Sequence, residues 1–546
     1  MVLGMLPWQH AVVRGSILDH KLATPMCQLY AKKKLLFTCG AFVAMVGLCP
    51  AQLAPSIEWQ HTFGGSADED VMSVAPTSDG GTIMAGRSMS NNGDLAGNHG
   101  LDDAWIIKTD GNGMLQWQHL FGGSGIDNAN CIRQTTDGGY IFTGNTSSHD
   151  GDVIGNHGGL DCWVVKVSPT GTMEWQEALG GTSDDAGQSI LQTSDGGYIV
   201  AGSTRSNDGN VSGHHGGSDG WVVKLDSQGT LEWQTCLGNS EFQALSGIAE
   251  TYDGGYIATG TATGSSSWDL WVVKLDDTGL LQWEQMLGGD MDDIGTMAQQ
   301  TADNGYIICG STLSNTGEFA CNHGGFDGFV IKLDPNGGME WQRTCIGGSA
   351  DDVLNAVAQT TDGGYVLAGW TESTDGDVSG NHGLIDGWLI RMDDTGTILW
   401  EKTLGGTGND GMSAVLLTNE GGYIVAGNSS SSDGDVSENK GGFDAWQVKL
   451  DPDHVGIASM DTRQVFRLYP NPVHDVLKIR MEANSPEFDH WRVLALDGRN
   501  TAWLASTHPP SSEQELRISV DQLPPGTYAL QLRSGSRTWT ERFVKQ

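Results

Sequence analysis

Basic residues are scarce in this sequence, and the shortage is concentrated in its long middle part. The chain has 29 Lys and Arg against 67 Asp and Glu, a formal net charge of −38. Residues 57–460 hold 13 basic and 56 acidic residues, whereas residues 461–546 hold 11 and 10. A field this negative repels nucleic acid and anionic membrane surfaces. We expect no nucleic-acid partner, and a surface suited to solubility, to cation binding or to neutral partners such as glycans.

Long apolar runs are also missing, and the longest candidate has another explanation. Residues 35–48 are too few to span a bilayer as a helix. They follow Lys32-Lys33-Lys34 and precede the small residues before Gln52, the pattern of a signal peptide cleaved after Ala51. Residues 1–25 fit no part of a signal peptide, so 1–51 is predicted to be an extension plus signal peptide, with Met26 as an alternative start. No transmembrane span is expected in the mature protein.

No pair of cysteines has the CxxC spacing, which excludes the usual thiolate zinc site. Export permits disulfides, but the six cysteines after the predicted cleavage share no common position, so their pairing stays open. They are Cys131, Cys162, Cys236, Cys309, Cys321 and Cys345.

A unit of about 58 residues recurs seven times, which is the signature of a repeat architecture. Each unit carries a Trp, a Gly-Gly-aromatic step and an Asp-x-aromatic step before an apolar run. The Trp residues are Trp59, Trp117, Trp175, Trp233, Trp283, Trp341 and Trp400. In the third unit, strands are predicted over 188–193, 198–202, 221–226 and 230–237, because β-branched runs alternate with Gly turns. Four strands in each unit predict a β-propeller.

The order of the landmarks predicts how the ring closes. The first unit opens with a strand of the fourth type, 57–63, and the last ends with a strand of the third type, 446–450. The N-terminal strand therefore completes the last blade and covers its exposed edge. We predict an all-β chain with a seven-bladed propeller over 52–456.

The repeats also resemble a known family. The stretches GGSADDVLNAVAQTTDGGYVLAGWTES (347–373) and DGWLIRMDDTGTILW (386–400) are similar to the SBBP β-propeller repeat of exported bacterial proteins. The resemblance covers about 57–452 and implies the fold but almost nothing about activity.

Residues 461–546 have a different character, with short strand-like runs around Pro and Gly turns that predict a small β-sandwich. The motifs resemble the type A sorting domain of the type IX secretion system, which implies that this machinery is a partner and that the protein is released or attached outside the cell. We place the linker at 457–465 and the sorting domain at 466–546. The motif residues are Tyr469, Pro470, Asn471, Pro472, Asp497, Gly498, Gly526, Tyr528 and Lys545.

One face of the propeller is predicted to be rich in loops and acids, because the connections from second to third strand and from blade to blade lie on the same side. Oxygen ligands two residues apart on a Gly-bent loop suit Ca²⁺, and the alternative is a repeated Asx-turn. The candidate calcium ligands are Asp150, Asp152, Asp208, Asn210, Asp375, Asp377, Asp433 and Asp435. No other cofactor is expected.

Other recurring polar residues point to scaffolding more than to chemistry. The loop histidines, the Asp before each third strand and the pairs such as Asp184-Asp185 recur around the ring, whereas an active site is normally unique. The five propeller arginines are widely separated, which disfavours a sialidase.

The fourth repeat departs from the pattern, because Gly264–Ser267 replaces the long loop and leaves Trp268 at a notch. Trp268 is a possible ligand contact that could stack on a sugar, or it fills its own shortened loop.

We predict a non-enzymatic exported propeller that binds a protein or glycan outside the cell. The alternatives are a glycan hydrolase or lyase and a structural surface-layer component.

Overall fold

The computed structural model describes residues 54–264, 267–453, 466–481, 490–495, 502–506, 515–534 and 537–546. The predicted signal peptide and the 457–465 linker lie outside these residues. The described part is all-β, as predicted, and its one helical element is the 3₁₀ turn η1 (Gly317–Phe319). No helix in it is long and apolar enough to cross a membrane.

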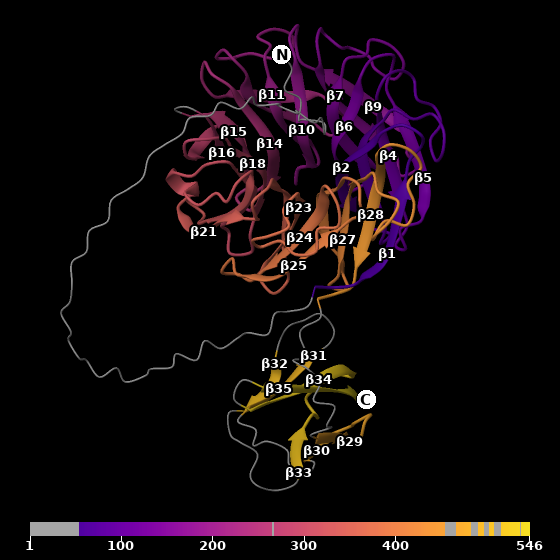
Figure 1. Ribbon diagram of the computed structural model, residues 1–546, viewed down its shortest axis with the longest axis vertical. Helices are drawn as coiled ribbons and strands as arrows, with labels where there is room; N and C mark the ends of the chain where they lie inside the picture. Colours follow the sequence, from indigo (N-terminus) through magenta and orange to yellow (C-terminus); the bar gives the residue numbers. More distant parts are fainter. Residues whose placement is uncertain are drawn as a thin grey trace, which may run out of the picture. The chain divides into compact units, whose positions relative to one another are not determined.

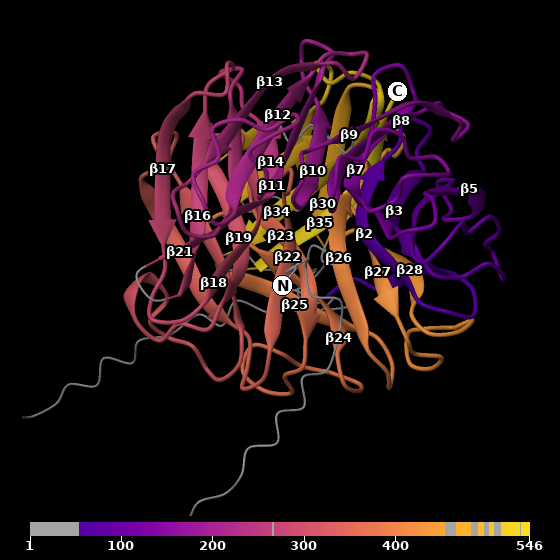
Figure 2. The same ribbon diagram turned by 90° about the horizontal axis from the view of Figure 1, so that it is seen from above.

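Seven four-stranded antiparallel sheets follow one another in chain order around a ring (Figures 1 and 2). We number them blades 1 to 7 and call their strands a to d from the centre outward. This arrangement confirms the predicted seven-bladed propeller. The strands of blades 1 to 3 are β2 (Glu69–Pro76), β3 (Thr82–Ser88), β4 (Asp103–Thr109), β5 (Leu115–Phe121); β6 (Asp127–Gln134), β7 (Tyr140–Thr146), β8 (Asp161–Val167), β9 (Met173–Leu179); β10 (Asp185–Gln192), β11 (Tyr198–Thr204), β12 (Asp219–Leu225) and β13 (Leu231–Leu237).

Blades 4 to 7 repeat the same order, and the last of them uses a strand from the start of the chain. Their strands are β14 (Gln243–Glu250), β15 (Tyr256–Thr263), β16 (Trp268–Leu275), β17 (Leu281–Leu287); β18 (Asp293–Gln300), β19 (Tyr306–Thr312), β20 (Asp327–Leu333), β21 (Met339–Ile346); β22 (Asp352–Gln359), β23 (Tyr365–Thr371), β24 (Asp386–Met392), β25 (Ile398–Leu404); and β26 (Asp410–Leu417), β27 (Tyr423–Ser429), β28 (Asp444–Leu450) and β1 (Ile57–Phe63).

Strands a and c of blade 3 begin earlier than the sequence predicts. β10 begins at Asp185 instead of residue 188, and β12 begins at Asp219 instead of residue 221. The additional residues are Asp, Ala and Gly and carry no large apolar side chain, and the amide N–H of Asp185 donates to the carbonyl of Leu160 in blade 2 (2.6 Å). The strand is therefore extended by contacts between blades, which a pattern of apolar residues does not reveal.

The ring closes through the N-terminal strand, as predicted. β1 pairs antiparallel with β28, and in Figure 1 indigo β1 lies beside orange β28. The indole N–H of Trp446 donates to Gln60 Oε1 (2.8 Å), and Lys449 Nζ lies 3.0 Å from a Glu58 carboxylate oxygen. Chain segments almost 400 residues apart thus share one blade.

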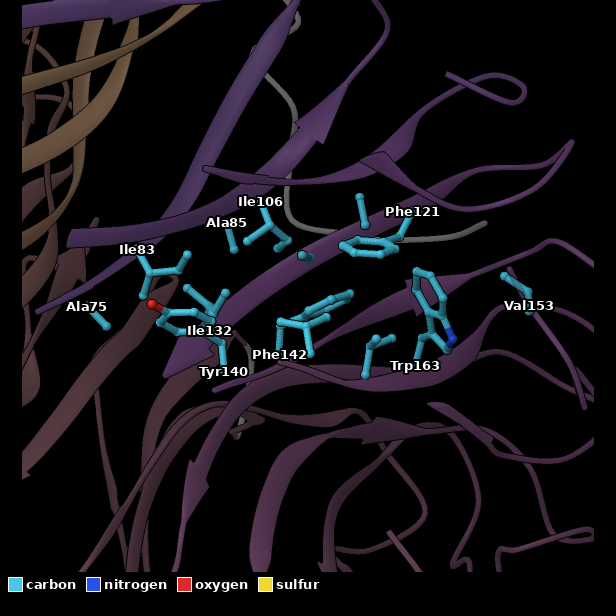
Figure 3. Packing of buried hydrophobic residues seen from close by; sticks show 14 of the residues in the cluster. Ala75, Ile83, Ala85, Ile106, Phe121, Ile132, Tyr140, Phe142, Val153 and Trp163 are labelled. Atoms are coloured by element: carbon cyan, nitrogen blue, oxygen red, sulfur yellow. The ribbon is translucent and has the colours of Figure 1, made fainter. Parts of the chain in front are cut away.

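The apolar core lies between successive blades. Figure 3 shows one such cluster, in which Phe121 of blade 1 and Phe142 and Trp163 of blade 2 lie close together. The rings of Phe142 and Trp163 meet edge to face at 5.6 Å between centroids. Burying one side chain of this size contributes about 2–3 kcal/mol, so stability depends on each blade having both neighbours.

In blades 1 to 6, a buried cation on strand c binds the turn between strands a and b, on the face opposite the long loops. In blade 2, Lys166 Nζ lies 3.0 Å from Asp137 Oδ2 in the turn between strands a and b. Blade 6 has Arg391 instead, which contacts both Asp362 (2.6 Å) and Asp453 (3.0 Å). Because Asp453 follows the last strand, the longer side chain also anchors the segment that leaves the ring.

The C-terminal residues form two further antiparallel sheets with a common apolar cluster. That cluster includes Leu477, Ile518 and Leu532. Their arrangement as a β-sandwich stays a prediction. The strands are β29 (Phe466–Tyr469), β30 (Val476–Met481) and β33 (Glu515–Ser519) in one sheet, and β31 (His490–Ala495), β32 (Ala502–Ser506), β34 (Gly526–Ser534) and β35 (Arg537–Lys545) in the other.

Candidate binding face

The connections between strands b and c lie against the connections that lead from blade to blade, on one face of the ring. In blade 2, Asp150 Oδ1 accepts a hydrogen bond from the amide of Ser124 (2.7 Å), and Asp152 Oδ2 accepts one from Gly122 (3.2 Å). Gly151 has a φ of +66°, a conformation that favours glycine and bends the loop between the two acids. We call this side of the propeller the loop face.

The eight candidate calcium ligands occupy equivalent places in four separate blades, and the structure does not gather them into one site. Asp208 accepts from the Thr182 amide (2.8 Å), Asp375 from Ser349 (2.7 Å) and Asp433 from Thr407 (2.8 Å). Asn210 and Asp435 accept weaker bonds from Gly180 and Gly405. These backbone hydrogen bonds lower the pKa of Asp150, Asp208 and Asp433.

The remaining geometry leaves few oxygens for a cation at each loop. Ca²⁺ takes six to eight oxygen ligands, whereas Asp150 and Asp152 each use one carboxylate oxygen on the backbone. Within the described ranges, no group of three or more Asp, Glu, His or Cys side chains is placed to hold a metal ion. Calcium binding therefore stays a prediction, and Asp377 stands apart because it faces Arg343 (3.9 Å).

Asp150→Asn separates a structural role of this loop from a calcium-binding role. Asparagine keeps the acceptor oxygen for Ser124 but loses the charge that attracts a cation. If the loop only closes on the backbone, the melting temperature of Asp150→Asn equals that of the wild type within about 1 °C, with calcium or with chelator. A calcium-dependent rise in melting temperature that Asp150→Asn abolishes would instead show a calcium site.

The recurrent histidines bind the Asp that begins strand c. His157 donates its amide N–H to Asp161 Oδ2 (2.9 Å), and its Nδ1 lies 2.8 Å from the same oxygen. The other members of this pattern are His99–Asp103, His215–Asp219, His323–Asp327 and His382–Asp386. Each contact closes one long loop onto the strand that follows it.

The two acids of each Asp pair between blades make different structural contacts. In the first pair, Asp184 Oδ1 accepts from the Leu160 amide of the preceding blade (3.2 Å). Asp185 accepts from the Gly181 amide and the Ser206 hydroxyl, both at 2.7 Å. The same division holds for Asp292 and Asp351, which accept from Trp268 (3.1 Å) and Phe326 (2.8 Å). The first acid of each pair thus joins adjacent blades, and the second holds the loops of its own blade.

Seven buried carboxylate oxygens have no hydrogen-bond partner among the described residues. They are the Oδ1 atoms of Asp103, Asp161, Asp219, Asp327, Asp386 and Asp444, and the Oδ1 atom of Asp102, the residue before strand c of blade 1, is the seventh. Each of the first six belongs to the Asp that begins strand c. A methyl group placed on Gly180 would lie 2.9 Å from Asp161 Oδ1 and 2.5 Å from Asp185 Oδ2. The two acids of adjacent blades therefore face the same small space beside a glycine.

Blade 4 differs from the others on the loop face. Its short connection leaves Trp268 half-buried at the start of β16, stacked on Phe242 with ring centroids 5.3 Å apart. Phe242 occupies the place that Asp184 holds in blade 3, and Gln243 the place of Asp185. The sequence comparison did not single out Phe242, although these two departures from the repeat mark it.

Blade 5 contains a disulfide between Cys321 and Cys345, which join its long loop to strand d. The other four cysteines of the described residues are unpaired thiols. The two partners lie at different positions of the repeat, so the sequence offered no signal for this pairing.

The described sorting-motif residues lie together beside the C-terminal strand. Asn471 Oδ1 accepts from the amide of Val544 (2.8 Å), and Gly526 pairs with Lys545 across β34 and β35. Tyr528 donates its hydroxyl to the carbonyl of Pro524 (2.7 Å). Lys478 Nζ lies 5.7 Å from the centre of the Tyr469 ring. Pro470 and Pro472 are exposed, whereas Asp497 and Gly498 lie outside the described residues.

Comparison with protein families supports this assignment. Residues 467–546 match the model of the secretion system C-terminal sorting domain. The chain is therefore an exported protein of the cell surface or extracellular space, and its tail is recognised by the secretion machinery. A search of curated proteins finds no match to the sequence, and the resemblance of the repeats to the SBBP family stays a prediction.

Several solved propeller structures are similar to this chain at low sequence identity. One is PorZ, described as an essential bacterial surface component of the type-IX secretion system of Porphyromonas gingivalis. It has 12% identity and a TM-score of 0.39, over 89% of this chain and 60% of PorZ. YCF48 bound to D1 peptide has 9% identity and a TM-score of 0.40, over 73% of this chain and 100% of YCF48. Sqt1 from Chaetomium thermophilum has 11% identity and a TM-score of 0.39, over 71% of this chain and 98% of Sqt1.

Proposed function

We propose that the propeller is a non-enzymatic binding module that captures a protein or glycan outside the cell, and that the C-terminal domain delivers it there. The observation that supports this proposal is that the repeated polar groups make structural contacts inside the propeller. The loop acids and histidines hold loops and blades together, as Asp150, His157 and Asp185 illustrate. A partner is therefore recognised by the residues in which one blade differs from the others.

A pull-down from the surface of the producing cells tests the binding role. The purified full chain is expected to retain a specific cell-surface protein or polysaccharide, and to release no reducing ends or shortened chains from it. Turnover of a polysaccharide would favour the alternative of a glycan hydrolase or lyase. Assembly of the chain into a regular layer without any other component would favour the surface-layer alternative.

Removal of the C-terminal domain tests the delivery step. A chain that ends before residue 466 is expected to accumulate in the periplasm, because the part recognised by the machinery is gone. The control fuses residues 466–546 to an unrelated periplasmic protein, which should then appear outside the cell. Normal export of the shortened chain would contradict this role, and fractionation followed by immunoblotting measures both outcomes.

A further inference from the structure

The notch of blade 4 exposes apolar side chains that the long loop covers elsewhere. Met286 on strand d is 44% exposed, whereas Leu120 and Ala178, at the equivalent positions of blades 1 and 2, are 8% and 5% exposed. Met291, in the connection to blade 5, is 50% exposed. Together with the stacked pair of Phe242 and Trp268, these side chains form an apolar patch at blade 4 on the loop face.

The stretch of chain that includes this notch carries almost no positive charge. Between Lys224 and Lys332 the sequence has fifteen acidic residues, and its single Lys or Arg is Lys274. Lys274 is only 2% exposed and lies 3.0 Å from Asp253 on the opposite side of the blade. No basic side chain of blade 4 is thus available to neutralise its loop face.

Several acids stand close to the aromatic pair. Glu241 precedes Phe242 and is exposed, and Asp290 precedes Met291 and is exposed. The Asp269 carboxyl beside Trp268 has a raised pKa, because it is buried and because the charges of Glu318 and Asp292 act on it. The backbone N–H of Trp268 also donates to Asp292 Oδ1 (3.1 Å), so the aromatic pair lies beside negative charge. The face of an aromatic ring itself also attracts cations.

We propose that the blade 4 notch binds a cationic polypeptide segment, one that places Lys or Arg side chains beside an apolar side chain. This inference rests on the proposed binding function and names its partner. An apolar side chain fits the opening beside Trp268 and Met291, while Lys or Arg meets Glu241 and Asp290. A neutral sugar gains nothing from the surrounding charge, and an anionic glycan is repelled by it.

Peptide binding to the full chain tests the proposal. The probes are three fluorescent dodecapeptides: one that alternates Lys-Lys with Leu-Leu, one with Ser in place of Leu, and one with Glu in place of Lys. Fluorescence anisotropy at low and high salt measures their affinities. We expect the Lys/Leu peptide to bind most tightly, with an affinity that falls as salt increases. No binding of this peptide would overturn the inference.

Variants identify the notch as the place of binding. Trp268→Ala is expected to lower the affinity for the Lys/Leu peptide at least tenfold, since buried aromatic anchors dominate such contacts. Glu241→Gln with Asp290→Asn should weaken it several-fold and reduce its salt dependence. Leu160→Ala, at the place equivalent to Trp268 in blade 2, is the matched control and should change the affinity less than twofold. Melting curves confirm that each variant is folded.

The same variants separate this inference from the proposed function. If the wild type and Trp268→Ala capture a cell-surface partner equally well, the notch is not the site, although the propeller still binds. If Trp268→Ala no longer binds neutral oligosaccharides such as chitohexaose but still binds the peptide, the proposed ligand class, a cationic polypeptide, is wrong. If the wild type retains no surface protein or polysaccharide, the binding function itself fails.

Discussion

The propeller is expected to become more stable as the pH falls from 7.5 to 5. Burial raises the pKa of Asp293, Asp327 and Asp444 to about 6, against the hydrogen bonds that they accept. It also raises the pKa of Asp103, Asp161 and Asp386. These carboxyls lie at the boundaries between blades, where two acids face one another and the ionisation of both is unfavourable in free energy.

The sign follows from the difference between the folded and unfolded chains. A carboxyl with a raised pKa holds its proton in the folded state at a pH where the unfolded chain has lost it. Its contribution is fully present below about pH 4 and is lost as the pH rises through about 6. Between pH 7.5 and 5, a pKa of about 6 instead of 3.8 adds about 1.4 kcal/mol per group. The three strongest cases together contribute about 4 kcal/mol.

A second set of acids determines the pH below which the stability of the folded protein decreases again. Although burial by itself raises their pKa, hydrogen bonds from Thr side chains and the buried Lys lower the pKa of Asp79, Asp137, Asp195 and Asp303 to about 2. Their contribution is present above about pH 4 and is lost as the pH falls toward 2. The free energy of unfolding should therefore be greatest near pH 4 to 5.

Thermal unfolding at several pH values measures this behaviour. We expect the melting temperature at pH 5 to exceed that at pH 7.5 by about 5 °C. The increase should persist in 0.5 M salt, because salt screens the repulsion between surface charges far more than that between buried groups. A melting temperature that does not fall between pH 5 and 7.5 in high salt would contradict the prediction.

Two single substitutions locate the effect at the blade boundaries. Asp161→Asn replaces one acid of a facing pair by a side chain that can donate to Asp185, so it should stabilise the protein at pH 7.5. Gln243→Asp makes the reverse change, because Gln243 takes the place of the second acid at the boundary of blades 3 and 4, where Asp219 is the Asp that begins strand c. We expect it to destabilise the protein at pH 7.5 by about 1–3 kcal/mol, and less at pH 5.

Removal of the closing strand should have the largest effect on folding. A chain that lacks Ile57–Phe63 leaves the edge of β28 unpaired and removes Gln60, which binds Trp446, and Glu58, which binds Lys449. It also removes the buried Phe63 from the boundary between blades 7 and 1. We expect the free energy of unfolding to fall by more than about 5 kcal/mol, and the exposed edge to promote aggregation.

A rearranged chain is the matched control for this deletion. Moving the strand sequence to follow Asp453, through a short Gly-containing turn, keeps all four strands of blade 7 but joins them in one continuous segment. Such a protein loses only the covalent closure of the ring, and its stability should lie between those of the wild type and the deletion. A synthetic peptide of residues 54–65 should raise the melting temperature of the deletion. Equal stability of all three proteins would contradict the importance of closure.

The repeat architecture could be predicted from the sequence because its signals are local. The Gly turns, the strand-c Asp and the regular Trp residues fix four strands per unit, and seven units fix the number of blades. Ring closure also followed from order alone, since the repeats begin with strand d of one blade and end with strand c. The sorting domain was recognisable because its motifs, such as Tyr469-Pro470-Asn471-Pro472, lie close together in the chain.

The roles of the polar residues were decided only by the tertiary structure, because their partners lie across blade boundaries. The repetition of pairs such as Asp184-Asp185 indicated scaffolding, but only the structure shows that its members bind Leu160 and Ser206 on different segments. Phe242 comes under Trp268 only because the chain between them folds as a hairpin, and Cys321 meets Cys345 only because a loop folds over strand d. Local sequence patterns determine the strands and the order in which they run. Contacts between segments far apart in the sequence determine which side chains meet.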